Sequence, residues 1–413
     1  MPPARAEVAV TGLGVVSGWG WGVGKLDAAL ASGGTSIRPF VRFDHERYPT
    51  HVAAEVPERR AASESVGREA SDLSFADTFA IAAAREAIAG AGLPGELSNH
   101  DAGVFFASCT GGGFECESFY EAWRGRNLWR GPRRLLASHP VSRPGEAVAR
   151  DLRVTGPVET VSSACASGTL AIGLALDALR TGTVDIAIAG GADSLAHITF
   201  GGFNVLQAMD EQPCRPFRAA RRGLSLGEGG AVLVLERLSE ARRRRAPIFA
   251  RLEGAGASGD AHHMTAPEPH GRGAAEAMAR ALRDADCRPD SVDWINTHGT
   301  GTVRNDLAEF HALEVVFGAH LDALHISATK GSVGHLLGAA GAIEAVATVL
   351  AIRNQRLQPA PGGGGIDPAI RVRLAREPVA ASIRRALSLN MGFGGCNAAL
   401  VFSSPGLGSE GAT

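Results

Sequence analysis

Short apolar runs alternate with longer helical patterns along almost the whole chain. Helical spacing of apolar residues predicts helices at 74–91, 169–179, 273–285 and 336–352. Apolar runs that end in glycine-rich turns predict strands at 8–10, 104–107, 158–161, 184–189, 231–235, 248–252, 292–296, 326–329, 386–389 and 398–402. Buried strands alternating with helices predict an α/β fold whose sheets are covered by helices on both faces.

One local pattern occurs twice. The strand at residues 8–10 is followed by Gly-Leu-Gly at 12–14, and the strand at 248–252 by Gly-Ala-Gly at 254–256. We interpret residues 12–14 as a tight structural turn, because a lone GxG is weak evidence for a phosphate loop. The echo suggests internal duplication. The expected units are an N-terminal half at 1–247, a C-terminal half at 248–405 and a disordered polar tail at 406–413.

Composition narrows the class of protein. The chain has 413 residues, 45% hydrophobic and 20% charged, as is usual for a globular protein with one large core or two fused domains. A formal net charge of −2 predicts neither nucleic-acid nor membrane binding. No apolar run of about 20 residues is present, and residues 1–7 have no signal-peptide core. Six cysteines without a CxxC pair favour a reducing cytoplasm and argue against disulfides or a metal site.

Cys165 lies where an extended run changes into a helix pattern. Residues 158–161 read as extended, 162–166 (Ser-Ser-Ala-Cys-Ala) as a turn and 169–179 as a helix. A thiol at this place meets free backbone N–H groups and the positive end of the helix dipole. Both lower the thiol pKa, and the N–H groups can hold an oxyanion. On this stretch alone, a nucleophile and a small buried side chain both remain open.

Further reactive side chains follow other expected strands. His298, Lys330 and His335 lie in glycine-rich turns, as does the Gly-Phe-Gly-Gly loop at 392–395. A thiolate can attack a thioester and become acylated, while two neutral imidazoles can donate hydrogen bonds to a developing enolate oxygen. The set suits decarboxylation of a malonyl thioester to a carbanion equivalent that attacks the acyl-cysteine. A cysteine protease would have no use for the second histidine and the lysine.

Four motifs resemble the elongating, Cys-His-His branch of the β-ketoacyl-ACP synthase family. They are 161–168 (Val-Ser-Ser-Ala-Cys-Ala-Ser-Gly), 296–302 (Asn-Thr-His-Gly-Thr-Gly-Thr), 330–341 (Lys-Gly-Ser-Val-Gly-His-Leu-Leu-Gly-Ala-Ala-Gly) and 392–397 (Gly-Phe-Gly-Gly-Cys-Asn). The resemblance covers roughly residues 8–402. It implies the thiolase fold, in which two similar halves build five αβαβα layers, and a homodimer.

The same resemblance implies an acyltransferase, a 3-oxoacyl-ACP synthase of fatty-acid biosynthesis. Such an enzyme carries out a ping-pong Claisen condensation on substrates carried by acyl carrier protein (ACP), without a cofactor. Cys165 would be the acylated nucleophile and would form the oxyanion hole with the backbone N–H of Phe393, the gating residue. His298 and His335 would serve malonyl decarboxylation. Further matches are Lys330, which organises the electrostatics, Glu344, its acidic partner through solvent, Thr300 and Thr302, which hold the phosphopantetheine arm, and the structural acids Asp306 and Glu309.

Departures from the family pattern concern the gate and the acyl pocket. The family usually has Asn-Ser-Phe where this chain has Leu-Asn-Met at 389–391, and Cys396 replaces a usual threonine. The family turn Gly-Ser-Gly-Ile-Gly-Gly reads Ala-Ser-Cys-Thr-Gly-Gly at 107–112, which puts Thr110 at the acyl pocket. Threonine is smaller and more polar than isoleucine, and methionine fills irregular space flexibly. We therefore expect the pocket to tolerate long, unsaturated or partly polar chains.

A basic stretch at residues 123–134 is a candidate docking surface for ACP, which is acidic. A solvated surface face explains the same residues, so both interpretations stay open. The arginines are Arg124, Arg126, Arg130, Arg133 and Arg134.

Two other functions remain open. A ketosynthase of a type II polyketide or polyene pathway would act as a heterodimer with a chain-length factor, and the pair Asn305–Asp306 is similar to such enzymes. A non-catalytic chain-length partner usually lacks the nucleophile, so Cys165 argues against it. Initiating synthases normally have His and Asn where this chain has His298 and His335.

Overall fold

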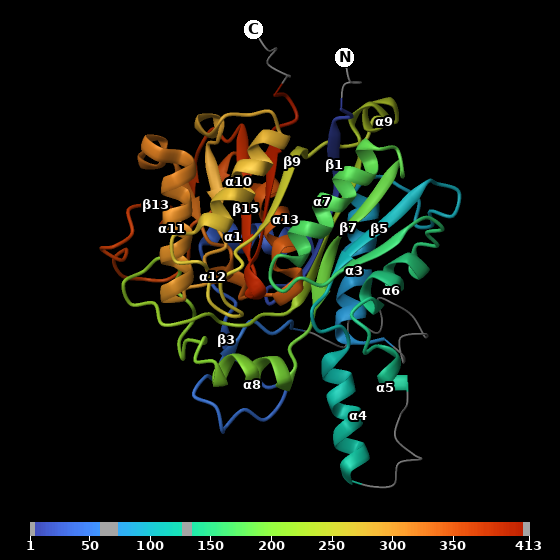
Figure 1. Ribbon diagram of the computed structural model, residues 1–413. Helices are drawn as coiled ribbons and strands as arrows, with labels where there is room; N and C mark the ends of the chain where they lie inside the picture. The colour runs from blue at the N-terminus through green and yellow to red at the C-terminus, as the bar shows by residue number, and fades with distance from the viewer. Residues whose placement is uncertain (1–4, 58–72, 126–133, 408–413) are drawn as a thin grey trace.

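The computed structural model describes residues 5–57, 73–125 and 134–407 (Figure 1). Within these ranges strands and helices alternate, and a 12-stranded sheet forms the centre of the protein. The α/β class predicted from the hydrophobic pattern is confirmed.

Two halves of this sheet have the same strand order and the same strand directions. Each half begins with three strands that pair antiparallel one after another. The third of them also pairs in parallel with a fourth strand, which in turn pairs in parallel with a fifth. The first half is β1 (Val8–Ser17), β8 (Gly229–Arg237), β7 (Ile186–Asp193), β5 (Ala102–Ala107) and β6 (Val158–Val161). The second is β9 (Ala250–Gly259), β16 (Cys396–Ser403), β15 (Arg385–Met391), β10 (Trp294–Asn296) and β11 (His325–Ser327), extended by β13 (Arg373–Leu374). β1 and β9 pair with each other and join the halves.

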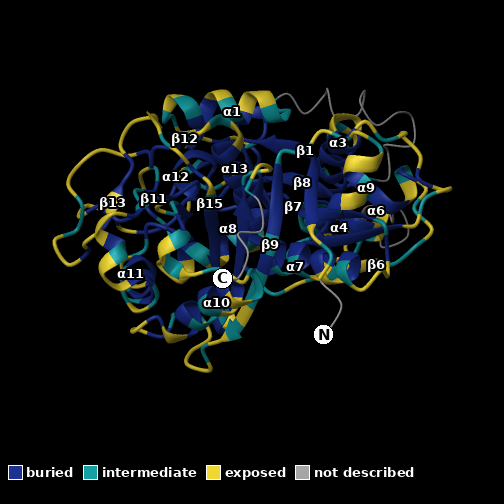
Figure 2. Ribbon diagram, turned by 90° about the horizontal axis from the view of Figure 1, so that it is seen from above, coloured by how far each residue is buried: buried dark blue, intermediate teal, exposed yellow. Residues whose placement is uncertain are grey.

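Helices lie between the two half-sheets and on both outer faces. The central layer is α7 (Ser167–Arg180) and α13 (Ala340–Asn354), which pack against strands of both halves. One outer layer contains α3 (Phe75–Gly90) and α6 (Arg143–Asp151), and the other contains α10 (Arg272–Asp284) and α11 (Val303–Phe317). Buried residues, dark blue in Figure 2, concentrate in the strands and central helices. The expected five-layered αβαβα thiolase fold is confirmed.

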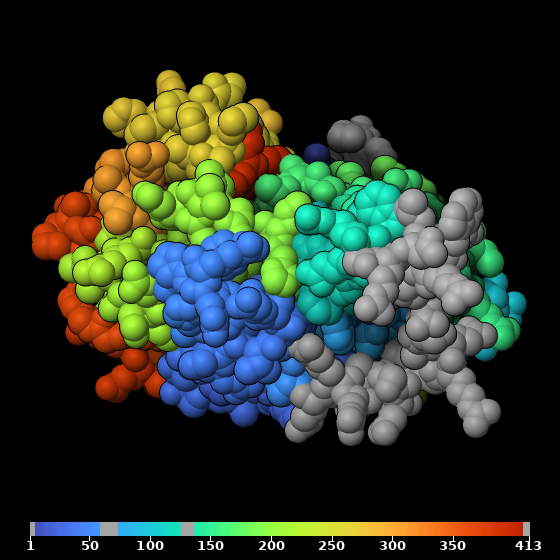
Figure 3. Space-filling model, turned by 90° about the horizontal axis from the view of Figure 1, so that it is seen from below, coloured from blue at the N-terminus to red at the C-terminus, as the bar shows by residue number. Residues whose placement is uncertain are grey.

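Smaller elements complete the fold. Figure 3 shows the lower face, where the segment around residues 40–50 (blue) meets α8 (yellow-green), and Phe43 packs on Phe200 with ring centroids 5.6 Å apart. The smaller helices are α1 (Val23–Ser32), α4 (Gly113–Gly125), α5 (Arg134–Ala137), α8 (His197–Val205), α9 (Leu238–Arg243) and α12 (Lys330–Val333). The short strands are β2 (Gly20–Trp21), β3 (Arg38–Pro39), β4 (Val52–Ala53), β12 (Arg356–Leu357) and β14 (Val379–Ala380).

The tight turn predicted at residues 12–14 is wrong, because this segment lies inside β1. A Cβ atom on Gly12 would clash with the carbonyl oxygen of Ala87 in α3. The glycines therefore let the helix seat directly on the strand. In the second half, Gly254 and Gly256 of β9 make the same close approach to α10. The repeated glycine pattern in the sequence therefore corresponds to the same close strand–helix contact in both halves of the protein.

Burial shows where two of the expected elements lie in the fold. β6 lies at the edge of the sheet, beside β5, and its Val158 is 38% exposed, so it is not the buried strand expected at 158–161. The segment Leu337–Asn354 is long and apolar enough to cross a membrane, but 89% of it is buried inside the protein. That burial identifies it as the core helix α13 with its preceding turn.

Two buried carboxyl groups near the start of α3 predict that stability falls as the pH rises. Burial raises the pKa of Asp77 to about 6 and the pKa of Glu115 to about 7. The native state therefore binds more protons than the unfolded chain between about pH 4 and pH 7. This contribution to stability is complete below that window and is lost as the pH rises through it.

Replacing Glu115 with glutamine should reduce this decline. Glu115→Gln keeps an acceptor for the N–H of Phe75 but removes the ionisation. The decrease in the free energy of unfolding on raising the pH should therefore be smaller by roughly 1–3 kcal/mol. Chemical denaturation at about pH 5 and about pH 8 measures the difference. An equal decline in the variant and the wild type would contradict the assignment.

Candidate active site

Cys165 is held in a rigid turn between β6 and α7. Its side chain is buried, and α7 begins at Ser167. The preceding Ala164 has a positive φ of 48°, a conformation that is costly for a residue with a Cβ atom. Its carbonyl oxygen accepts hydrogen bonds from Ser167 Oγ at 2.6 Å and from Cys109 Sγ at 3.3 Å. These contacts hold the turn that presents the thiol.

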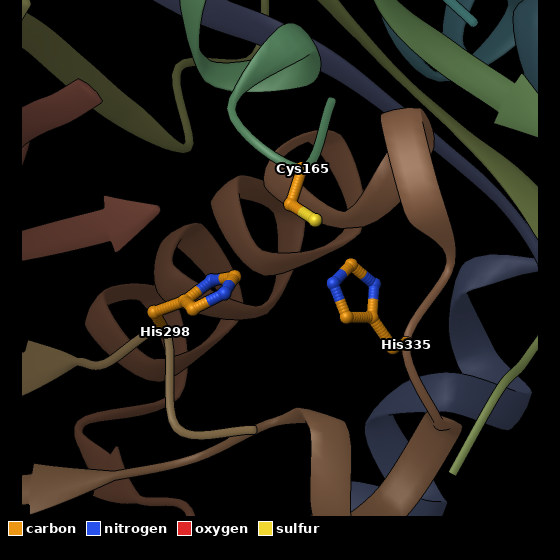
Figure 4. Close-up of side chains that lie close together, drawn as sticks. All are labelled: Cys165, His298 and His335. Carbon is orange, nitrogen blue, oxygen red and sulfur yellow. The ribbon is translucent and has the colours of Figure 1, made fainter. Parts of the chain in front are cut away.

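Two histidines from the second half of the chain lie beside the thiol (Figure 4). His298 follows β10, His335 follows α12, and both are buried. Their ring centroids are 5.7 Å apart, with the ring planes at 85°. Potential ligand atoms of Cys165, His298 and His335 all lie within 4.8 Å of one another. The structure therefore brings together the three residues that the sequence motifs singled out.

Hydrogen bonds to the Nδ1 atoms determine which nitrogen of each imidazole carries the proton. The backbone N–H of Leu337 donates to Nδ1 of His335 at 3.0 Å. Nζ of Lys330 donates to Nδ1 of His298, also at 3.0 Å. Nδ1 is thus an acceptor in both rings, and the proton lies on Nε2. Burial, followed by the charge of Lys330, holds the pKa of both histidines well below the usual range, so each offers a neutral Nε2–H donor.

The same hydrogen bonds argue against a metal site at these three residues. Their ligand atoms are close enough to surround an ion. A metal bound through Nε2 requires an imidazole whose Nδ1 donates its proton to a partner. Leu337 and Lys330 impose the reverse arrangement. The geometry favours two hydrogen-bond donors toward a substrate.

Lys330 forms a direct ion pair with Glu344, so the expectation of solvent between them is wrong. Nζ lies 2.5 Å from Oε1 of Glu344, and both side chains are buried. The ammonium group also donates to the carbonyl oxygen of His298 at 2.7 Å. Asn390 donates from Nδ2 to the second carboxylate oxygen of Glu344 at 2.7 Å. A buried ion pair needs such additional hydrogen bonds.

The expected low pKa of the Cys165 thiol is wrong for the protein without substrate. Burial raises this pKa to about 11, although Lys330 and the backbone N–H groups of Phe393 and Cys165 oppose the shift. The N–H groups at the helix start do stabilise the thiolate, but desolvation of a buried anion outweighs them. The thiol therefore keeps its proton near neutral pH until a substrate arrives.

Two buried acids fix the backbone after β10, which agrees with the structural role expected for them. Glu309 accepts hydrogen bonds from the N–H groups of His298 at 2.6 Å and Gly299 at 2.8 Å. Asp306 accepts from the N–H groups of Phe217 at 2.7 Å and Gly301 at 3.1 Å. These contacts hold the turn that carries His298.

A cavity of about 380 Å³ connects the three residues with the surface. Its inner lining includes Cys165, His298 and His335, and its outer lining includes the exposed Leu206 and Val303. Thr300, Thr302 and Phe393, which were also expected to face a substrate, line the same cavity. The hydroxyl groups of the two threonines are 3.0 Å apart, and the Phe393 ring packs against Phe203 at 5.5 Å.

Thr110 does not line this cavity, and its hydroxyl group is already engaged. Oγ1 of Thr110 donates to Oδ1 of the buried Asp193 at 2.8 Å, and its backbone N–H donates to the same atom at 2.9 Å. The hydroxyl proton is therefore used within the protein, and only the oxygen lone pairs remain as acceptors. The effect of Thr110 on the acyl chains that the pocket accepts stays a prediction.

The predicted docking arginines are only partly described. Arg124 is exposed in the last turn of α4. Arg134 is the first residue of α5, but its side chain is outside the described part of the protein. Arg126, Arg130 and Arg133 also lie outside the described residues. Their role as a docking patch stays a prediction.

Sequence reasoning missed two residues that support the site. Asn390 was noted only as a departure from the family pattern, yet it binds Glu344 and lies 3.3 Å from Nδ1 of His298. Asp193 was not singled out, because it follows the strand expected at 184–189, yet it accepts hydrogen bonds from segments on both sides of the site. An acid at the end of a fully apolar strand is the signal that could have identified Asp193.

Comparisons with known proteins agree with this geometry. The N-terminal domain of β-ketoacyl synthases matches residues 5–241, and the C-terminal domain matches residues 249–363. The 3-oxoacyl-[acyl-carrier-protein] synthase 2 of Staphylococcus aureus (strain COL) is 36% identical over 408 residues, which cover 96% of this chain and 98% of the relative.

Ketosynthases are also found among the solved structures that resemble this chain. The ishigamide ketosynthase/chain length factor is 34% identical with a TM-score of 0.92, over 98% of this chain and 100% of that chain. A type II polyketide ketosynthase in complex with its acyl-carrier protein is 28% identical with a TM-score of 0.89, over 97% of this chain and 100% of that chain. The matched fold, the matched domains and the Cys-His-His group agree, and the chain belongs to the β-ketoacyl synthase family of acyltransferases.

Proposed function

We propose that the protein is a β-ketoacyl-ACP synthase that condenses an acyl group on Cys165 with malonyl-ACP, with loss of CO2. The observation that carries this proposal is the pair of neutral imidazoles beside the thiol, each with its proton on Nε2. Two such donors suit an enolate oxygen better than they suit a peptide or ester hydrolysis. The reaction needs no cofactor, because the substrates arrive on the phosphopantetheine arm of ACP.

In the first step the acyl group moves from the carrier to Cys165. The sulfur attacks the thioester carbonyl, and the backbone N–H groups of Phe393 and Cys165 stabilise the oxyanion. The bond to the carrier sulfur breaks, and the released carrier thiolate takes up the proton lost by the Cys165 thiol. This transfer explains why a thiol with a raised pKa can still react: attack and proton loss occur within one bound complex.

In the second step malonyl-ACP replaces the free carrier. The bond between the carboxylate and the α-carbon breaks, CO2 leaves, and the electron pair is delocalised onto the thioester oxygen. The Nε2–H groups of His298 and His335 stabilise that enolate, and the Lys330–Glu344 pair keeps Nδ1 of His298 an acceptor. The α-carbon then attacks the acyl carbonyl, and the Cys165 thiolate leaves as the product forms on ACP.

The same proposal assigns a binding site for the carrier arm and a contact surface for a partner subunit. Thr300 and Thr302 line the cavity, and their hydroxyl groups, which lie 3.0 Å apart, are of a chemical type suited to the amide groups of the arm. The exposed edge strand β6 is the surface that we expect to pair with a second subunit, because an unpaired strand edge is a template for strand addition. A homodimer in the cytoplasm is the arrangement expected for a fatty-acid enzyme.

A type II polyketide or polyene ketosynthase is the second candidate function. It is favoured by the likeness to the ishigamide ketosynthase/chain length factor, at 34% identity and a TM-score of 0.92. Such an enzyme would form a heterodimer with a chain-length factor. The presence of Cys165, His298 and His335 in one site argues that this chain is the catalytic subunit and not the chain-length partner.

The proposal is tested by supplying acyl-ACP and malonyl-ACP and measuring CO2 together with the acyl product. We expect one β-ketoacyl-ACP, two carbons longer, from the fatty-acid function. Repeated condensation without reduction, and only when a chain-length factor is added, would support the second candidate. The absence of both products with an acylatable enzyme would contradict a condensing function.

Enlarging residue 110 is expected to shorten the longest acyl chain that the enzyme accepts. Thr110→Phe adds an aromatic ring at the position where the resemblance places the acyl pocket, and a packed interior tolerates such added volume poorly. Malonyl decarboxylation should match that of Thr110→Ala, which loses the same hydroxyl donor to Asp193 without adding volume. Competition among acyl-ACPs of different lengths measures the effect, and Thr110→Ser is the control of similar size. Identical chain-length profiles would show that Thr110 does not border the pocket.

Charge reversal in the basic stretch is expected to weaken carrier docking. Arg133→Glu with Arg134→Glu should raise the KM for ACP substrates by roughly tenfold or more, because like charges across an interface disfavour association. Activity on short pantetheine thioesters should be unchanged. Arg283→Glu, an exposed arginine on α10, is the control. Equal losses on both substrates would show a folding defect and contradict docking.

A further inference from the structure

One buried carboxylate joins two segments that border the active site. Asp193, at the end of β7, accepts a hydrogen bond from Ser108 Oγ at 2.7 Å. It also accepts the N–H of Cys109 at 3.0 Å and both the N–H and the hydroxyl group of Thr110. Its other oxygen accepts the N–H of Gly338 at 2.7 Å. Residues 108–110 follow β5 in the first half, whereas Gly338 lies just after His335 in the second.

The contact with Gly338 leads directly to His335. Leu337, the second of the two residues between them, has a positive φ of 52°, which a residue with a Cβ atom adopts only when its surroundings impose it. Its N–H is the group that donates to Nδ1 of His335. The hydrogen bond from the N–H of Gly338 to Asp193 fixes the backbone directly after this strained residue. Asp193 thereby helps to orient the N–H that keeps the proton of His335 on Nε2.

The contact with Cys109 leads to the nucleophile. Asp193 binds the backbone N–H of Cys109, and the Cys109 thiol donates to the carbonyl oxygen of Ala164 at 3.3 Å. Ala164 is the strained residue directly before Cys165. A Cβ atom on Gly338 would lie 2.8 Å from Asp193 Oδ2 and 2.9 Å from the Cys109 nitrogen, so the two segments are in close contact here.

We propose that Asp193 is a positioning residue of the condensation reaction. It holds two strained backbone turns, one before Cys165 and one after His335, so that the thiol and the Nε2–H donor keep their relative position. This inference rests on the proposed function of those two groups. It assigns Asp193 no contact with the substrate, and it predicts that loss of the charge disturbs the tautomer of His335 and the chemical step together.

Asp193→Asn tests the assignment. The amide has one acceptor oxygen where the carboxylate has two, and its NH2 group would face N–H and O–H groups that now donate to Asp193. We expect the Nε2–H form of His335 to become mixed with the Nδ1–H form, seen by 15N NMR of histidine-labelled protein and assigned with His335→Ala. We also expect kcat for CO2 release from malonyl-ACP to fall roughly tenfold to a hundredfold, with KM little changed. A residue that only stabilises the fold would alter neither readout.

Glu236→Gln is the matched control, since Glu236 is a buried acid on the neighbouring β8 that accepts a hydrogen bond from Thr11. It should lower the melting temperature without changing the tautomer or the ratio of kcat to KM. If Asp193→Asn behaves like this control, the proposal is wrong. If Asp193→Asn does not fold, Ser108→Ala, which removes one donor to the carboxylate, decides: it should give a smaller loss of the same kind, and wild-type values would overturn the proposal. The NMR readout needs no substrate, so it separates failure of this assignment from failure of the proposed function.

Discussion

Replacing Cys165 with alanine is expected to abolish acylation and condensation while the protein stays folded. The substitution removes the sulfur that forms the acyl-enzyme, and among the described residues that line the cavity no other side chain is a nucleophile of comparable strength. The fold should persist because alanine fits where a small buried thiol was. Mass spectrometry after incubation with acyl-ACP measures the adduct, and circular dichroism checks the fold.

Cys287→Ala is the control for this prediction, because Cys287 is a partly buried cysteine that does not line the active-site cavity. It should keep full acylation and condensation. An acyl adduct that persists in Cys165→Ala, on any other cysteine, would remove the assignment of the nucleophile.

His335→Ala is expected to separate the two halves of the reaction. Cys165 should still accept an acyl group, whereas CO2 release from malonyl-ACP should fall by a factor of roughly 10²–10³, equivalent to about 3–4 kcal/mol for one lost donor to a developing oxyanion. The reason is that His335 contributes one of the two neutral Nε2–H groups beside the thiol.

Acylation and CO2 release are measured in separate single-turnover assays. His311→Ala, at a partly exposed histidine on α11, controls for general damage and should leave both rates unchanged. CO2 release at the wild-type rate in His335→Ala would contradict its role, and loss of both steps would place His335 in acylation as well.

The sequence predicted the parts of the site that depend on local pattern. Cys165, His298 and His335 each follow an expected strand in a glycine-rich turn, and the ends of neighbouring strands meet in an α/β fold. The alternation of apolar strands and helices predicted the class of the fold, and the repeated glycines at 12–14 and 254–256 indicated its duplication. The glycines at 12–14 were predicted wrongly to form a turn, because the close contact of each strand with its helix depends on tertiary packing and not on the local sequence.

Properties that depend on burial could not be predicted in this way. The pKa of the Cys165 thiol is set by desolvation from all sides, not by the start of α7 alone. The ion pair of Lys330 with Glu344 depends on how closely α12, α13 and β15 pack, and so does the hydrogen bond that the amide of Asn390 donates to Glu344. Asp193 collects donors from two segments that are 84 and 145 residues away in the chain. No local pattern carries that information.

The measurement that tests the account most directly is a two-stage mass analysis of the peptide that contains Cys165. The enzyme is first incubated with an acyl-ACP, and the acylated enzyme is then isolated and mixed with malonyl-ACP. The account predicts that the acyl mass appears on Cys165 in the first stage. In the second stage it should disappear from Cys165, while CO2 and a β-ketoacyl-ACP form in equal amounts. An acyl mass that stays on Cys165 while the product forms, or that never appears there, would contradict it.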